Sequence, residues 1–193
     1  MMYCMLFVSL VLIKFSGSHI IHATSPINQT CLNLGHANNC HFYQCFEERF
    51  PCGSAYWILK WGYKYCTRMQ KSLLNFDKNG QELIEQISTC LTNKLIKLRY
   101  YTMNKINCEK LRLAGQRMVH ECYMNSSNLF CKAFQGKNRD CFIQLIDNED
   151  RHDVTIVRTL LSVGQTCTPK KRLSDMRPTG KMNQCISSPT LLT

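Results

Sequence analysis

The most compact group of potential metal ligands lies in the first quarter of the chain. It consists of His36, Cys40, His41 and Cys45, which fall within ten residues. Imidazole and thiolate are ligands of tetrahedral zinc, but this spacing does not match that of a zinc finger. In an exported protein, cysteines meet an oxidising compartment and usually pair with each other. Disulfide bonding is therefore the preferred interpretation, and we expect no metal or other cofactor.

Two acid–base neighbours have the residue types needed for proton transfer. His120 is followed by Glu121, and His152 by Asp153. Adjacent residues of a helix point in different directions, so neither pair forms a dyad by its spacing. The chain also contains no Gly-x-Ser-x-Gly elbow and no His-Glu-x-x-His motif. We therefore predict that the protein is not an enzyme.

Residues 76–80 (Phe-Asp-Lys-Asn-Gly) resemble the opening of a calcium loop, because carboxylate and amide oxygens precede a glycine. A complete EF-hand loop needs a closing Glu at its twelfth position, and Ser88 occupies that place when the count starts at Asp77. A turn between two helices is the better interpretation. Asn79 is the predicted N-cap of the second helix, with Glu82 as its reciprocal acceptor.

Cysteines dominate the composition. Twelve of the thirteen lie beyond residue 30, and the first eight of these run C-x8-C-x4-C-x6-C-x13-C-x23-C-x17-C-x13-C from Cys31 to Cys122. An even number of closely set cysteines after an export signal indicates a disulfide framework. Residues alone do not decide the pairing, since twelve cysteines allow about ten thousand connectivities.

Residues 1–23 are predicted to form a secretory signal peptide. An apolar run over residues 5–13 is too short to span a bilayer, and Ser16, Ser18 or Ala23 offers a small residue for cleavage. No second apolar stretch is long enough for a membrane helix, so we expect no transmembrane segment. The protein is therefore predicted to be secreted and extracellular.

The chain is basic, with a formal net charge of +11. Outside the cell, such a charge favours acidic partners such as sulfated glycans or anionic surfaces, although it also serves simple solubility. We expect no nucleic-acid partner. Asn28 and Asn125 open Asn-x-Ser/Thr triplets, which are acceptors for glycosylation in an exported protein.

Helical periodicity begins near residue 63, whereas residues 24–52 show no sustained period. The predicted fold is therefore all-α: a disulfide-cross-linked helical domain over residues 24–167, with a loop-rich N-terminal region and a basic C-terminal tail. The predicted helices are 63–76, 80–100, 108–124, 141–146 and 154–163. The last of these carries Val154, Val157, Leu160 and Leu161 on one side.

Residues 168–193 have the composition of a flexible tail, rich in Pro, Ser, Thr and basic residues. Lys170, Lys171 and Arg172 form a basic cluster within it. Three interpretations remain open for this cluster: cleavage by a basic-site convertase, a heparin-binding patch, or an ordinary solvated tail.

Several motifs together resemble the stanniocalcins, secreted disulfide-bonded glycoprotein hormones. The similarity covers Cys31 to about Cys167, which is most of the expected mature chain. The motifs are Cys31-Leu32-Asn33, then Cys40 and Cys45, Phe76-Asp77-x-x-Gly80, Glu121-Cys122-Tyr123, and Val157-Arg158-x-Leu160-Leu161.

The resemblance implies a specific set of disulfides. The implied pairs are Cys31–Cys45, Cys40–Cys66, Cys52–Cys108, Cys90–Cys122 and Cys131–Cys167. Cys141 and Cys185 fall outside this set. Cys185 could pair with Cys141 within one chain, or it could join two chains as a homodimer.

The resemblance also implies a function. The stanniocalcins are hormones of calcium and phosphate balance, and some members inhibit pappalysin-type metalloproteinases. We therefore expect a signalling glycoprotein that binds a receptor or another extracellular protein. The alternative is a secreted cysteine-rich basic effector that binds anionic glycans or membrane surfaces.

Overall fold

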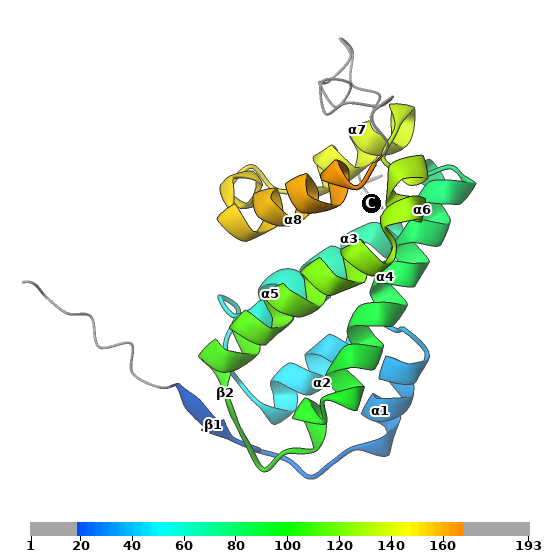
Figure 1. The fold of residues 1–193 in the computed structure, drawn as a ribbon. Helices are drawn as coiled ribbons and strands as arrows, with labels where there is room; N and C mark the ends of the chain where they lie inside the picture. The colour runs from blue at the N-terminus through cyan, green and yellow to red at the C-terminus, as the bar shows by residue number, and fades with distance from the viewer. Residues whose placement is uncertain (1–18, 168–193) are drawn as a thin grey trace, which may run out of the picture.

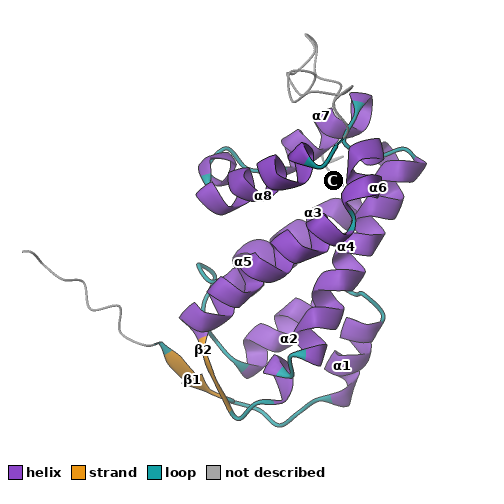
Figure 2. Cartoon of the chain, viewed as in Figure 1, coloured by secondary structure: helices purple, strands orange, loops and turns teal. Residues whose placement is uncertain are grey.

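A computed structural model describes residues 19–167, and this part of the chain is mostly helical (Figures 1 and 2). The all-α prediction is confirmed. None of the described helices combines the length and the apolar character that crossing a membrane requires. The α-helices are α1 (Gln29–His36), α2 (His41–Arg49), α3 (Lys64–Lys71), α4 (Lys78–Lys97), α5 (Cys108–Asn125), α6 (Ser127–Ala133), α7 (Gly136–Leu145) and α8 (Val154–Gln165).

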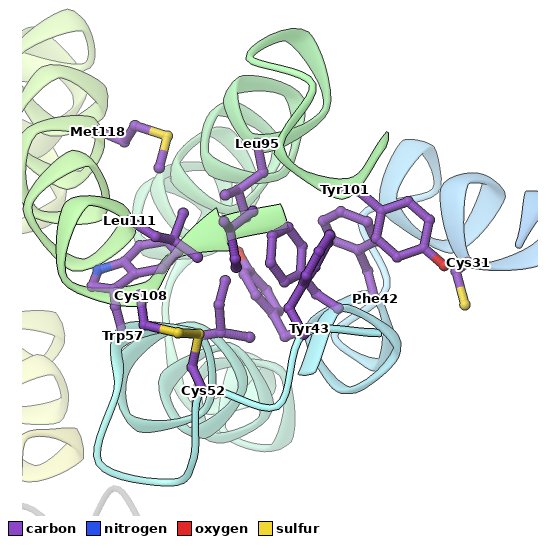
Figure 3. Close-up of a cluster of buried hydrophobic side chains, with 14 of the residues drawn as sticks. Cys31, Phe42, Tyr43, Cys52, Trp57, Leu95, Tyr101, Cys108, Leu111 and Met118 are labelled. Atoms are coloured by element: carbon purple, nitrogen blue, oxygen red, sulfur yellow. A yellow bond between two sulfur atoms is a disulfide. The ribbon is translucent and has the colours of Figure 1, made fainter. Parts of the chain in front are cut away.

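The long helices α4 and α5 pack against each other and form the centre of the molecule (Figure 1). Helices α1 and α2 cover one end of this pair, and α6, α7 and α8 gather at the other end. The buried side chains accordingly fall into two hydrophobic clusters. The first cluster is rich in aromatic rings, among them Phe42, Tyr43, Trp57 and Tyr101 (Figure 3). The second contains Leu83, Ile87, Phe130, Phe142 and Val163.

Helix α4 begins two residues earlier than expected, because its N-cap is Asp77 and not Asn79. The Asp77 carboxylate accepts a hydrogen bond from the Gly80 N–H at 3.0 Å. It also accepts one from the Asn138 side chain at 2.6 Å, while the Asp77 N–H donates to the Asn138 Oδ1. The cap prediction was wrong because Asp77 has a tertiary partner that local spacing does not reveal.

Helix α5 agrees with its prediction over 108–124, and the structure explains the glycine in its middle. A Cβ atom at Gly115 would lie 2.3 Å from the Trp57 indole ring. The ring therefore packs directly on the backbone of α5. Close packing at this point requires glycine, despite its cost to helix stability.

We predicted a loop-rich N-terminal region, but helices α1 and α2 occupy much of residues 24–52. Asn28 caps α1 by accepting a hydrogen bond from the Thr30 N–H at 2.8 Å. Each helix is only eight or nine residues long. Helices of this length are marginal in isolation, and burial of their apolar side chains in the first cluster stabilises them here.

The helix expected over residues 63–76 is split into three parts. A turn of π-helix, η1 (Ile58–Tyr63), leads into α3, and a 3₁₀ turn, η2 (Leu73–Asn75), follows it. Two helices near the C-terminus also differ from prediction. Helix α7 begins five residues before the predicted 141, and α6 was not predicted at all.

A two-stranded antiparallel sheet joins the start of the described chain to the segment before α5. Strand β1 (Ile20–His22) pairs with β2 (Lys105–Asn107), with Ile21 opposite Ile106. Further hydrogen bonds extend this contact, from the Cys108 N–H to the His19 carbonyl and from the Ala23 N–H to the Asn104 carbonyl. Residues 19–23, which fall inside the predicted signal segment, are thus part of the fold.

Candidate functional site

Five disulfides cross-link the described residues, and they are the five pairs that the resemblance implies. Two join neighbouring helices: one connects α1 to α2, and another connects α4 to α5. Of the other three, one joins the segment before α2 to helix α3, and one joins the segment after α2 to the start of α5. The last joins α6 to the segment that follows α8. They are Cys31–Cys45, Cys90–Cys122, Cys40–Cys66, Cys52–Cys108 and Cys131–Cys167.

The four residues weighed as zinc ligands do not form a metal site. Cys40 and Cys45 are both consumed in disulfides, with different partners. His36 and His41 are exposed on the surface. No group of three or more His, Cys, Asp or Glu in residues 19–167 is arranged to hold a metal ion.

The carboxylates of the two adjacent His–acid pairs, Glu121 and Asp153, make other contacts. Glu121 accepts a hydrogen bond from Lys94 of α4 at 2.5 Å, which lowers the pKa of its carboxyl group. Asp153 accepts one from the Ile156 N–H at 3.4 Å, at the start of α8. Both carboxylates therefore have structural partners.

Both glycosylation acceptors lie on the surface. Asn28 is exposed, and its Oδ1 caps α1. Asn125 is the last residue of α5 and is also exposed. Their positions suit the attachment of a large hydrophilic glycan.

Helix α8 carries three exposed large apolar residues, more than any other described helix. Val154 is 69 % exposed, Val157 39 % and Leu161 43 %. Their spacing of three and four residues places them in one stripe along the helix. Together with Arg158 and Arg151 they line a shallow hollow.

The opposite side of α8 is packed into the second cluster. Val163 is fully buried, Thr159 is nearly so, and Leu160 packs against the cluster. The sequence predicted Leu160 on one side with Val157 and Leu161, but Leu160 does not lie in the exposed stripe. The apolar positions of α8 cover about half of its circumference, which includes both the exposed stripe and part of the buried side, so apolar periodicity alone does not separate the two.

A group of ion pairs holds the segment before α8 against α3; we call it the clasp. Asp150 is 3 % exposed and accepts hydrogen bonds from the Tyr65 hydroxyl at 2.5 Å and from Lys64 at 3.1 Å. Lys60 approaches the same carboxylate at 3.4 Å. Asp147 pairs with both Lys64 and Arg68.

The clasp changes the titration of its members. Burial alone would raise the pKa of Asp150, but the hydrogen bond from Tyr65 and the contacts with Lys64 outweigh burial, so the pKa is lowered. Hydrogen bonds from Arg68 and Lys64 lower the pKa of Asp147. Both carboxylates are thus stabilised in the charged form.

Several expectations fall on residues that lie outside the described range. These are the basic cluster Lys170, Lys171 and Arg172, the tail over residues 168–193, and Cys185. Cys141 is buried and disulfide-bonded. Whether Cys185 pairs with it or joins two chains stays a prediction, as do the heparin-binding and cleavage interpretations of the tail.

Comparison of the chain with protein-family models, with curated proteins and with solved structures finds no match. The stanniocalcin resemblance stays a prediction from the sequence motifs, and the five described disulfides have the pairing that it implies.

Proposed function

We propose that this protein is a secreted, disulfide-bonded signalling glycoprotein, similar to the stanniocalcins, that acts by binding another extracellular protein. The observation that carries the proposal is the disulfide framework. Its five pairs are those of the family that the motifs resemble, and disulfides of this density are typical of oxidising compartments. The two exposed glycosylation acceptors suit the same compartment.

The outer face of α8 is the surface that we propose for this contact. It combines an apolar stripe (Val154, Val157 and Leu161) with the guanidinium group of Arg158. Interfaces are enriched in apolar anchors and in Arg. The matching partner is a protein surface with an apolar centre and carboxylates at its edge.

Binding of labelled, secreted protein to cells of the source organism tests this proposal. We expect Val157→Asp and Leu161→Asp each to weaken binding by roughly fivefold or more, because a carboxylate would be buried against an apolar and acidic partner. Leu74→Asp is the matched control, since Leu74 is 91 % exposed and lies outside α8. Equal binding by all three variants, with their disulfides intact, would rule out the α8 contact.

The same assay separates a protein partner from an anionic glycan. Binding to a protein should persist after the cells are treated with heparinase and should depend weakly on salt. A basic effector, the alternative function, should lose binding in both conditions, because screening weakens charge contacts. Truncation at residue 167 would then show whether the tail supplies the charge.

The resemblance also suggests two activities to measure. The first is control of calcium and phosphate transport in responsive cells, and the second is inhibition of a pappalysin-type metalloproteinase. Each should require the intact disulfide framework, so reduced and alkylated protein is the control. Activity that survives reduction would argue against a role for the folded domain.

A further inference from the structure

An apolar cavity of about 130 Å³ lies where the two hydrophobic clusters meet. Its walls come from η1 and from each of the helices α2 to α8. Protein interiors are close-packed, with few voids larger than a water molecule. By the measure of about 10–15 Å³ for each water, this cavity has room for about ten.

The wall of the cavity is unsuited to water. It contains no Lys, Arg, His, Asp or Glu among the described residues, and its surface is overwhelmingly apolar. A buried water needs two to four polar partners. Eight aromatic rings contribute instead: Tyr43, Trp57, Trp61, Tyr65, Tyr123, Phe130, Phe134 and Phe142.

Two tyrosine hydroxyls supply polar groups at this wall. Tyr43 is 1 % exposed, and burial raises the pKa of its phenol well above the usual range. Burial also raises the pKa of Tyr123, to about 12. A tyrosine hydroxyl both donates and accepts hydrogen bonds, so each can pair with an oxygen of a bound molecule.

The backbone around the cavity is adapted to hold these rings in place. Residues of η1 form a single π-helical turn, a feature that often marks functional sites. Gly62 lies in this turn, and a Cβ atom there would approach the Tyr43 ring to 2.5 Å. The Tyr43 ring therefore packs on bare backbone, and both residues line the cavity.

We propose that this cavity binds a small, neutral, lipophilic molecule of about ten non-hydrogen atoms that carries one hydroxyl or carbonyl oxygen. The apolar wall fits its hydrocarbon part, and the Tyr123 hydroxyl hydrogen-bonds its oxygen. A carboxylate head group is disfavoured, because an ion buried without a counter-charge loses its hydration uncompensated. The site is separate from the outer face of α8 and does not depend on the proposed partner.

Titration of the full secreted protein with 1-octanol and with octanoate tests the site, because the two probes share a chain length and differ in charge. Both tryptophans of the chain, Trp57 and Trp61, line the cavity, so their fluorescence reports occupancy directly. We expect saturable binding of one 1-octanol per chain, measured by fluorescence and calorimetry, and weaker binding of octanoate. A co-purified neutral molecule released by organic extraction would support the same conclusion.

Two variants test whether 1-octanol binds in this cavity. Val119→Phe fills part of it, and we expect the affinity for 1-octanol to fall by roughly tenfold or more, since the buried apolar contact is lost. Tyr123→Phe removes only the hydroxyl and keeps the ring. We expect an affinity about two- to tenfold lower for 1-octanol, which matches the loss of one hydrogen bond. Tyr100→Phe, away from the cavity, is the matched control and should bind normally.

Three results would overturn the proposal. These are no saturable binding of 1-octanol by protein with intact disulfides, octanoate binding as tight as that of 1-octanol, and unchanged affinity in folded Val119→Phe. Helical content and the disulfide pattern establish that each variant is folded. If Val119→Phe does not fold, the comparison of Tyr123→Phe with Tyr100→Phe decides: equal affinity of these two would reject the site.

Discussion

At the residue scale, Gly115 determines how closely Trp57 approaches α5. Intrinsic propensity alone would make Gly115→Ala stabilising by about 1 kcal/mol in a helix interior. The structure predicts the opposite sign, because the new methyl group would lie 2.3 Å from the indole ring. Overpacking of a core typically costs about 1–3 kcal/mol. Urea unfolding should therefore show Gly115→Ala to be destabilised.

The double variant Gly115→Ala/Trp57→Leu is the control for this prediction. Removal of the indole gives the methyl group space, so the alanine should cost much less in the Trp57→Leu background. An alanine that destabilises both backgrounds equally would show that the Trp57 contact is not the cause.

Asp77 is the second residue whose role can be tested singly. Asp77→Ala removes the N-cap of α4 and the hydrogen bond that the Asn138 side-chain amide donates to the carboxylate. We expect a loss of about 1–2 kcal/mol in the free energy of unfolding, as for other N-caps. Asn79→Ala should change stability by no more than about 0.5 kcal/mol, because Asn79 is exposed and lies inside the helix. A larger effect at Asn79 than at Asp77 would contradict the observed cap.

At the element scale, the helices that sequence predicted well are those with long apolar periods. Helix α5 matched its predicted bounds closely, and α4 was displaced by two to three residues at each end. Helices α1, α2 and α6 were missed because seven to nine residues make only about two turns, which is too short for a sustained apolar period. Their stability comes from tertiary burial and from disulfides such as Cys31–Cys45, which local patterns do not encode.

The candidate surfaces were predictable to different degrees. The cysteine spacing and the accompanying motifs were enough to imply all five described disulfides through a family resemblance. The sequence shows that the stripe of α8 is apolar, but it does not show that the stripe is exposed. Leu160 and Leu161 are the same residue type, yet Leu160 packs against the second cluster and Leu161 is exposed. The cavity had no sequence signal, because eight elements from separate parts of the chain form its wall.

Strand β1 leads to a prediction about processing. Ser16 and Ser18 place small residues at the positions that signal peptidase requires for cleavage before His19. His19 also contacts the Tyr56 hydroxyl through its Nδ1 at 3.0 Å, so this boundary preserves the whole sheet. Intact-mass measurement and N-terminal sequencing of secreted protein should find His19 first. A chain that starts at Thr24 would lack β1 and would contradict this boundary.

At the scale of the whole molecule, α8 connects the two proposed binding sites. Ile156, Thr159 and Leu160 form part of the cavity wall, whereas Val157 and Leu161 point to the outer hollow. A molecule in the cavity would therefore contact the helix whose other face is available to a partner. The position of α8 depends in turn on the clasp that precedes it and on the Cys131–Cys167 disulfide that follows it.

The clasp makes the stability of this arrangement depend on pH. The folded-state pKa values of Asp147 and Asp150 are lowered, so their contribution is fully present above the unfolded value of about 3.9 and is lost as pH falls through the folded values. Near neutral pH, Asp150→Asn should reduce the free energy of unfolding by about 1–3 kcal/mol, because charge-assisted hydrogen bonds from Lys64 and Tyr65 are lost.

The difference between wild type and Asp150→Asn should shrink as the pH falls below about 4 and then through the lowered folded-state pKa of Asp150, where the wild-type carboxylate takes up a proton. Glu121→Gln is the control, since the Lys94–Glu121 pair also joins two helices but its carboxylate is 53 % exposed. Surface pairs contribute about 0–1 kcal/mol, so this variant should show a small effect at every pH. Urea unfolding from about pH 3 to 8 measures both variants. If Asp150→Asn lowers the free energy of unfolding equally at every pH, the carboxylate acts through packing and not through its charge. The position of α8 would then not depend on the ionisation of the clasp.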